Sequence, residues 1–386
     1  MHLIRKVAGP VSWLAATIFA IPALSAEPVV VIAAFNLTGP EAALDAPCYK
    51  GAELAAATLN EAGGVLGRPI RLVPVDTASD TGSTTGKLAQ ALKAHPNAVA
   101  GIGFTDSTFA LDAGLVFQKA KIPFITPGAT APDLPQTVGS GMFLASYGDD
   151  AQAQVMASYA WNQLKIRRVA LWVDNSRLFT RTVGGFFEAS FRKLGGAVER
   201  QEFGARATDF GALIAAYQTA DPRLEAIYAA TMPETAVPLI SKVRAAGIDV
   251  PLLSADGWAD EDIVAASKSE GTGGIYFTTH RFLGVDTPAM KAFAAAYKEK
   301  YGSAPPNSFA ALGFDSVNLL AAAIERAGSV SPDSVRAALA GTRDFQGVAG
   351  KIAYAPGKRV PGKAVAVVRI DDGVETPVWT WTPPQH

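Results

Sequence analysis

The sequence contains few of the side chains that form disulfides or bind metals. Among 386 residues there is one cysteine, Cys48. A single cysteine excludes an internal disulfide, and we interpret Cys48 as a small buried apolar residue rather than a nucleophile. The four histidines stand far apart, without the paired spacing typical of zinc ligands, at His2, His95, His280 and His386. We therefore expect neither a metal site nor a cofactor.

The chain also lacks an excess of charge of either sign. Its 34 Lys and Arg residues nearly balance 35 Asp and Glu residues, for a formal net charge of −1. This balance disfavours nucleic acid as a partner. Common enzyme signatures are missing too: no GxSxG elbow occurs, no GxGxxG follows the first apolar strand, and Gly82–Lys87 is one residue short of a phosphate-binding loop. We predict that the protein is not an enzyme.

Long hydrophobic runs are confined to the N-terminus. Residues 1–26 combine a positive start at Arg5 and Lys6, a mostly apolar stretch from Val7 to Leu24, and small residues at the end. This pattern is typical of a cleavable secretory signal peptide. A membrane anchor is the alternative, but one glycine and two prolines interrupt a run that is short for a bilayer. The one cysteine lies well past the cleavage point, so we expect a periplasmic protein that is not a lipoprotein.

What the sequence does contain is a regular alternation of strand and helix patterns. Val29–Phe35 is a fully apolar run suited to a buried strand, and Ile70–Asp76 is a second strand candidate. Between them an apolar helical face over Gly51–Leu59 ends at Gly63-Gly64, a typical C-terminal stop. This spacing predicts a parallel βαβ unit. The alternation of strand and helix patterns predicts an α/β fold. Further strands are predicted at 98–102, 122–126, 168–173, 197–203, 226–229 and 251–254.

The C-terminal third has a different pattern. Two long helices, one shorter helix and three late strands are predicted in turn at 287–301, 309–327, 332–340, 350–354, 363–370 and 374–381. Before this third, the α/β pattern forms two runs of about 120 residues, and each run begins with a strand. Two similar lobes are therefore expected.

The segment from Asn36 to Asp76 is the most informative part of the chain. Its motifs are Leu37–Pro40 (LTGP), Lys50–Ala55 (KGAELA), Ala62–Gly64 (AGG), Gly67 and Asp76. In order and spacing they resemble the opening of the leucine/isoleucine/valine-binding family of type I periplasmic solute-binding proteins of ABC transporters. The resemblance implies a two-lobed fold in which each lobe is a mostly parallel sheet flanked by helices.

The resemblance also implies that the chain crosses between the lobes three times, near 145–148, 277–281 and 355–362. Lobe 1 is then expected to comprise residues 27–146 and 280–356, and lobe 2 residues 147–279 and 357–386. Three crossings form a hinge, and a ligand bound between the lobes is expected to close it.

Two loops at the carboxyl ends of predicted strands offer groups that suit a carboxylate. Gly103–Thr108 follows the strand at 98–102, and Pro127–Pro132 follows the strand at 122–126. Helix N-termini and small-residue loops expose backbone N–H groups. From the residues alone, ordinary helix capping is the favoured interpretation. The resemblance implies that these loops hold the α-carboxylate of an amino acid, through Thr105, Gly128, Ala129 and Thr130.

In the second lobe the strand at 251–254 leads to Asp256, where the resemblance places the acid that pairs with the α-ammonium of the ligand. A solvated turn aspartate is the alternative. Three positions where the family often carries an aromatic residue or tyrosine hold Leu44, Phe179 and Met232 here. With two further aromatic residues they suggest an apolar pocket, although each is equally consistent with core packing: Leu44, Phe104, Phe179, Met232 and Trp258.

Together these features predict an exported solute-binding protein of an ABC-type uptake system. We expect an apolar or branched-chain amino acid as the ligand, a membrane permease as the partner, and a monomeric state. Another small carboxylate or amide, including an aromatic one, is the alternative ligand. A sensory or regulatory subunit, which would use the same two-lobed clamp to signal, is the alternative role.

Overall fold

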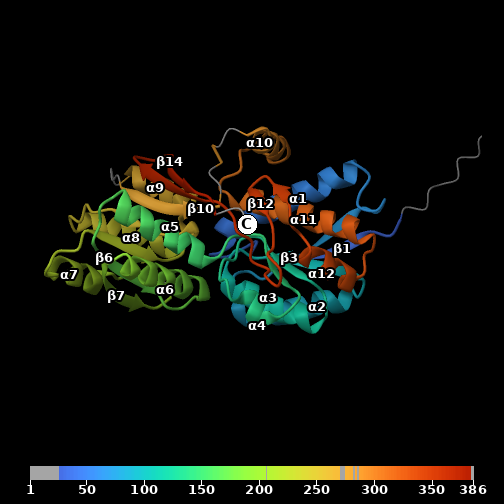
Figure 1. Cartoon of the computed structure of the whole chain (residues 1–386), viewed down its shortest axis with the longest axis horizontal. Coiled ribbons are helices and arrows are strands. Elements are labelled where there is room, and N and C mark those ends of the chain that lie inside the picture. Colours follow the sequence, from blue (N-terminus) through green and yellow to red (C-terminus); the bar gives the residue numbers. More distant parts are fainter. Residues whose placement is uncertain (1–25, 206, 270–273, 281–282, 285–286, 384–386) are drawn as a thin grey trace, which may run out of the picture.

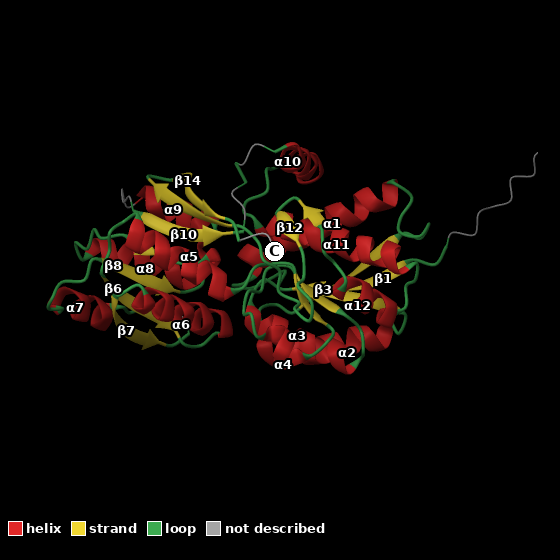
Figure 2. Cartoon of the chain, in the orientation of Figure 1, coloured by secondary structure: helices red, strands yellow, loops and turns green. Residues whose placement is uncertain are grey.

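The computed structural model describes residues 26–383, apart from 206, 270–273, 281–282 and 285–286. Two α/β lobes lie side by side along the long axis of the molecule (Figure 1), and in each lobe the strands lie between helices (Figure 2). The two-lobed α/β prediction is therefore confirmed. Within the described residues no helix is long and apolar enough to cross a bilayer. The predicted signal peptide, except for Ala26, lies outside the described residues.

Lobe 1 is built on a five-stranded, fully parallel sheet in the order β2-β1-β3-β4-β5. Strands β1 and β3 are buried along their whole length, which explains their uninterrupted apolar sequences. The strands are β1 (Val29–Phe35), β2 (Ile70–Asp76), β3 (Ala98–Gly103), β4 (Phe124–Thr126) and β5 (Met142–Leu144). The helices between them are α1 (Ala42–Glu61), α2 (Thr81–Ala94), α3 (Ser107–Lys119) and α4 (Leu134–Val138).

Lobe 2 is built on a seven-stranded sheet in the order β14-β13-β10-β9-β8-β6-β7. The strands from β7 to β10 are parallel, and β13 and β14 add an antiparallel edge. The strands are β6 (Arg168–Asp174), β7 (Ala197–Phe203), β8 (Ala226–Ala230), β9 (Leu252–Leu253), β10 (Ile275–Thr279), β13 (Val365–Asp371) and β14 (Val374–Trp381). The helices are α5 (Asp149–Asn162), α6 (Leu178–Lys193), α7 (Gly211–Thr219), α8 (Pro233–Ala245), the 3-10 turn η1 (Asp256–Trp258) and α9 (Glu261–Ser269).

The segment between β10 and β13 returns to lobe 1. It contains α10 (Pro288–Tyr301), α11 (Phe309–Ala327), α12 (Pro332–Ala340) and the hairpin of β11 (Phe345–Gly347) and β12 (Gly350–Ile352). Helix α11 packs along α1 at backbone-to-backbone distance. A Cβ atom on Gly51 of α1 would lie 1.8 Å from the Ala310 carbonyl oxygen, and one on Gly313 of α11 would lie 1.8 Å from the Cys48 carbonyl oxygen. The first and last parts of lobe 1 are therefore joined through two reciprocal glycine contacts.

Replacing Gly51 with alanine is expected to destabilise the protein by about 1–3 kcal/mol, because the new methyl group forces α1 and α11 apart. Thermal or urea unfolding measures this change. Gly86→Ala is the matched control, since Gly86 lies exposed in α2 and a methyl group added there would have no atom within 4 Å. It should raise stability slightly, through helix propensity alone. Equal behaviour of the two variants would contradict the close packing.

The chain passes between the lobes three times, as predicted: from β5 to α5, from β10 to α10, and from β12 to β13. The predicted place of the second crossing was partly wrong. Phe277–Thr279 belongs to β10, which pairs with β9 on one side and β13 on the other. The hydrophobic run was part of a buried strand rather than a connection. Arg281 lies outside the described residues.

The first and third crossings are tied to each other by hydrogen bonds. The Tyr354 hydroxyl donates to the Leu144 carbonyl at 2.8 Å, and the Lys363 ammonium donates to the Ala145 carbonyl at 3.0 Å. Both donors are buried side chains. These two connecting segments are therefore packed together rather than being independent linkers.

Candidate ligand-binding site

The two lobes contact each other directly across the cleft. Arg177, at the start of α6 in lobe 2, lies 2.5 Å from the Glu41 carboxylate of lobe 1 and 3.2 Å from the Glu234 carboxylate of its own lobe. The backbone N–H of Leu178 donates to the Thr108 hydroxyl at 3.1 Å. The structure therefore represents a closed arrangement, in which both lobes cover the side chains between them.

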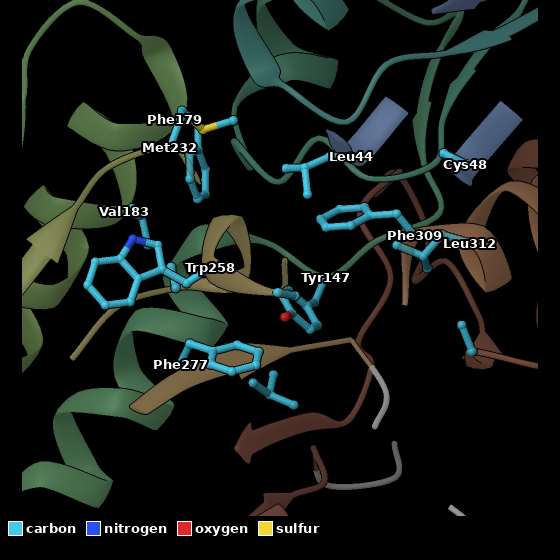
Figure 3. Close-up of a cluster of buried hydrophobic side chains, with 14 of the residues drawn as sticks. Leu44, Cys48, Tyr147, Phe179, Val183, Met232, Trp258, Phe277, Phe309 and Leu312 are labelled. Carbon is cyan, nitrogen blue, oxygen red and sulfur yellow. The ribbon is translucent and has the colours of Figure 1, made fainter. Parts of the chain in front are cut away.

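Apolar side chains from both lobes also face one another between the lobes (Figure 3). Leu44 and Phe309 come from lobe 1, and Phe179, Met232 and Trp258 come from lobe 2. Tyr147, from the first crossing, lies between the two groups in the same view. None of these six side chains is more than 5% exposed. Four of the five predicted wall residues are thus brought together, and we call these six residues the inter-lobe cluster.

Phe104 is the predicted wall residue that lies elsewhere. Its ring packs in the core of lobe 1, stacked on Phe109 of α3 with the ring centroids 5.6 Å apart. Its backbone has φ +62°, in the left-handed region that bulky residues seldom adopt. This turn directs the side chain into the core while the next residue, Thr105, faces α1. Core packing, the alternative for every wall residue, is the arrangement observed here.

Thr105 is held by a carboxylate of the protein itself. Both its backbone N–H and its hydroxyl donate to Oδ1 of Asp45 in α1, each at 2.7 Å, and the Asn36 N–H donates to Oδ2 at 2.7 Å. Burial raises the pKa of Asp45 to about 7 against the lowering effect of these hydrogen bonds, and the charge of Asp106 adds to the rise. Asp45 is therefore a protonatable group at the loop where a ligand carboxylate was predicted.

The N–H groups of the Gly128–Thr130 loop have partners within the protein. Gly128 donates to the Phe104 carbonyl at 3.5 Å, Ala129 donates to the Thr126 hydroxyl at 3.1 Å, and Thr130 donates to the Ser107 hydroxyl at 3.3 Å. The first of these is too long to be strong. A Cβ on Gly128 would lie 2.8 Å from the Phe309 ring, so this loop packs directly against the inter-lobe cluster.

Asp256 lies in η1, after β9, as the centre of a buried polar network. Its Oδ1 accepts from the Gln152 amide at 2.8 Å, and its Oδ2 lies 2.8 Å from Nε2 of His280. The side-chain carbonyl of Gln152 in turn accepts from the Asp256 N–H at 3.2 Å and from the Thr278 hydroxyl at 2.7 Å. The alternative of a solvated turn aspartate is wrong, because Asp256 is only 2% exposed.

The same network contains a second buried carboxyl group and an imidazole. Asp149, at the start of α5, accepts from the Gln152 amide at 2.9 Å. Burial raises its pKa well above the usual range, and the charge of Asp256 contributes. Burial lowers the pKa of His280, against the effect of its hydrogen bond to Asp256. The His280 ring stacks on Tyr147 at 4.0 Å, which connects the network to the inter-lobe cluster.

Several residues of this region were not predicted from the sequence. Asp45 follows Leu44 directly, and an acid in the first turn of a helix next to a predicted wall residue was an available signal. Tyr147 lies within a predicted crossing. His280 lies within another predicted crossing, 24 residues from Asp256. Nothing in the sequence pattern distinguishes Gln152, which lies 104 residues from Asp256.

Comparison with known proteins assigns the chain to a family. The model of the periplasmic binding protein family matches residues 29–375. The chain belongs to this family. Its members are solute-binding proteins and not enzymes, so the prediction of a solute-binding protein is confirmed.

Two relatives match most of the chain. The chain is 30% identical over 308 residues to an amino acid binding protein of Pseudomonas aeruginosa, covering 79% of this chain and 80% of that protein. It is 26% identical over 371 residues to the Leu/Ile/Val-binding protein homolog 3 of Brucella melitensis, covering 95% and 98%.

Solved structures of the same family agree with the fold. A leucine-binding protein from Thermotoga maritima has a TM-score of 0.85 and 27% identity, covering 92% of this chain and 99% of its own. A branched-chain amino acid binding protein from Streptococcus pneumoniae, solved with isoleucine, has a TM-score of 0.84 and 27% identity, covering 92% and 100%. The predicted leucine/isoleucine/valine-binding resemblance is thereby confirmed.

Proposed function

We propose that this protein binds an apolar amino acid between its two lobes and delivers it to the permease of an ABC-type importer. The observation that carries the proposal is the inter-lobe cluster, in which apolar side chains of both lobes face one another (Figure 3). Lobe 1 adds the Thr105 loop beside this cluster, and lobe 2 adds the buried Asp256 network.

The chemistry of a zwitterionic ligand supports a site with polar groups on both lobes. A buried charge without a partner is costly, so both poles of an amino acid need partners. In our proposal Asp256 pairs with the α-ammonium, while Thr105 and the loop of Gly128, Ala129 and Thr130 hold the α-carboxylate. Because the ammonium and carboxylate groups of the ligand are then bound by different lobes, both contacts form only in the closed state. Ligand binding therefore favours closure.

The relatives favour the same ligand class, since three of them carry names or bound ligands of the branched-chain amino acids. We extend this to an exported, monomeric protein that works with a membrane permease. The N-terminal pattern of Arg5, Lys6 and the following apolar run supports export to the periplasm. A sensory role would use the same site, and loss of amino acid uptake in a deletion strain would distinguish transport from sensing.

Thermal shift of the purified protein tests the ligand class. Leucine, isoleucine or valine at 100 times its dissociation constant should add about 2.7 kcal/mol of apparent stability. Two matched controls each lack one pole: the amino acid amides lack the carboxylate, and the deaminated acids lack the ammonium. Both should shift the protein less than the parent amino acid. A shift by the deaminated acids alone would contradict the ammonium assignment and favour a small carboxylate as the ligand.

A further inference from the structure

The hydrogen bonds of Asp45 determine what the Thr105 hydroxyl can offer to a ligand. A hydroxyl group has one proton to donate and lone pairs to accept. In this structure the Thr105 proton goes to Oδ1 of Asp45, at 2.7 Å. The hydroxyl oxygen therefore has only acceptor capacity left for any other group. A ligand carboxylate, which is also only an acceptor, finds no donor in that hydroxyl while Asp45 is ionised.

Protonation of Asp45 reverses the donor and acceptor roles in its hydrogen bond with the Thr105 hydroxyl. A protonated carboxyl group gains one O–H donor. If the new O–H donates to the Thr105 oxygen across the same 2.7 Å contact, the Thr105 proton is released to point toward the cleft. Oδ1 still accepts from the Thr105 N–H, and Oδ2 still accepts from the Asn36 N–H. One proton taken up by Asp45 thus converts Thr105 from an acceptor to a donor, with no other hydrogen bond lost.

We propose that Asp45 is a specificity-determining residue, which takes up one proton when a carboxylate ligand binds at Thr105. The proposal rests on the proposed function, because it places the ligand carboxylate at that hydroxyl. It explains how a buried aspartate can stand at a loop assigned to an anion. Two carboxylates on either side of one hydroxyl group repel each other, and a proton taken up by Asp45 removes the repulsion.

The surroundings of Asp45 favour its neutral form. Asp45 and Thr105 lie in the interior, at 0% and 7% exposure. The charge of Asp106, from the N-cap of α3, acts on Asp45, and Asp45 in turn raises the pKa of Glu41, the N-cap residue of α1. Cys48 lies one turn after Asp45 and is itself harder to ionise because of burial and Asp45. Burial and Asp106 both raise the pKa of Asp45, and its value of about 7 places the transition within a physiological range.

Isothermal titration calorimetry of the full mature protein with leucine tests the proposal. Titrations in buffers of different ionisation enthalpy should show uptake of about half a proton per ligand bound at pH 7, and of nearly one proton at pH 8.5. The dissociation constant should rise about 30-fold from pH 6 to pH 8.5, as expected for a group that titrates near 7 and admits the ligand only when protonated.

Two variants separate Asp45 from other titrating groups. Asp45→Asn is always neutral and should bind leucine with little pH dependence and no proton uptake. Thr105→Val removes the hydroxyl, and it should weaken binding at pH 6 while leaving little change at pH 8.5. Leucine binding by the wild type without proton uptake, or with affinity that rises with pH, overturns the proposal and leaves the proposed function standing. Failure of every amino acid to bind at any pH sinks the proposed function and this proposal with it.

Discussion

Replacing Asp256 with asparagine is expected to weaken binding of an apolar amino acid by about two to three and a half orders of magnitude. The carboxylate is the group we assign to the α-ammonium, and the substitution removes its charge while keeping its shape. Leaving a buried charge without its partner costs about 3–5 kcal/mol, and each decade of affinity corresponds to about 1.4 kcal/mol. Calorimetry with the amino acid identified by thermal shift measures the change.

The asparagine variant is preferable to alanine, because the network of Asp256 can accommodate an amide. Nδ1 of His280 has no hydrogen-bond partner in the described part of the chain, so the ring proton can move there and leave Nε2 as an acceptor. The amide can then donate to His280 and accept from Gln152. Asp262→Asn is the matched control, since Asp262 is exposed four residues after η1 and should not affect binding. Unchanged affinity of Asp256→Asn would refute the ammonium assignment.

Replacing Arg177 with methionine is expected to increase the rate of ligand dissociation about a hundredfold. Arg177 is the cation between Glu41 of lobe 1 and Glu234 of lobe 2. Removing one partner of a buried ion pair destabilises a protein by about 3–5 kcal/mol. Because the Arg177 side chain is 17% exposed, we expect the closed state to lose stability near the lower end of this range. Because Glu41 and Arg177 belong to different lobes, opening the hinge separates them, so the loss is expected to fall on the closed state. The association rate should change little.

Stopped-flow kinetics and small-angle scattering together measure this effect. Wild-type protein should become more compact on binding ligand, and the Arg177→Met protein should need more ligand to reach the same compaction. Arg192→Met is the matched control, because Arg192 lies on the same helix α6 in a surface ion pair with Glu188 and is 52% exposed. Surface ion pairs of this kind contribute about 0–1 kcal/mol to the stability of a protein. Equal dissociation rates in the two variants would show that Arg177 does not hold the lobes together.

Local patterns were sufficient to predict most of the elements. The strand Val29–Phe35, the helix that ends before Gly63-Gly64, and the strand Ile70–Asp76 appear in the structure as β1, α1 and β2, with the predicted parallel pairing. These features depend on apolar periodicity and on helix-ending glycines, which act over a few residues. The predicted crossing at 277–281 was partly wrong because a short apolar strand and an apolar connection have the same composition.

The sequence by itself determined the fold class, the family and the two loops that lead to Thr105 and Thr130. Only the tertiary structure decided which groups these residues contact. Thr105 meets Asp45 from a helix 60 residues earlier, and Asp256 meets Gln152 from a helix 104 residues earlier. Phe104 fills the core while Phe179 joins the inter-lobe cluster, although both are apolar residues at predicted pocket positions. The reason is physical: periodicity records that a side chain is buried, while the packing of distant elements decides what it is buried against.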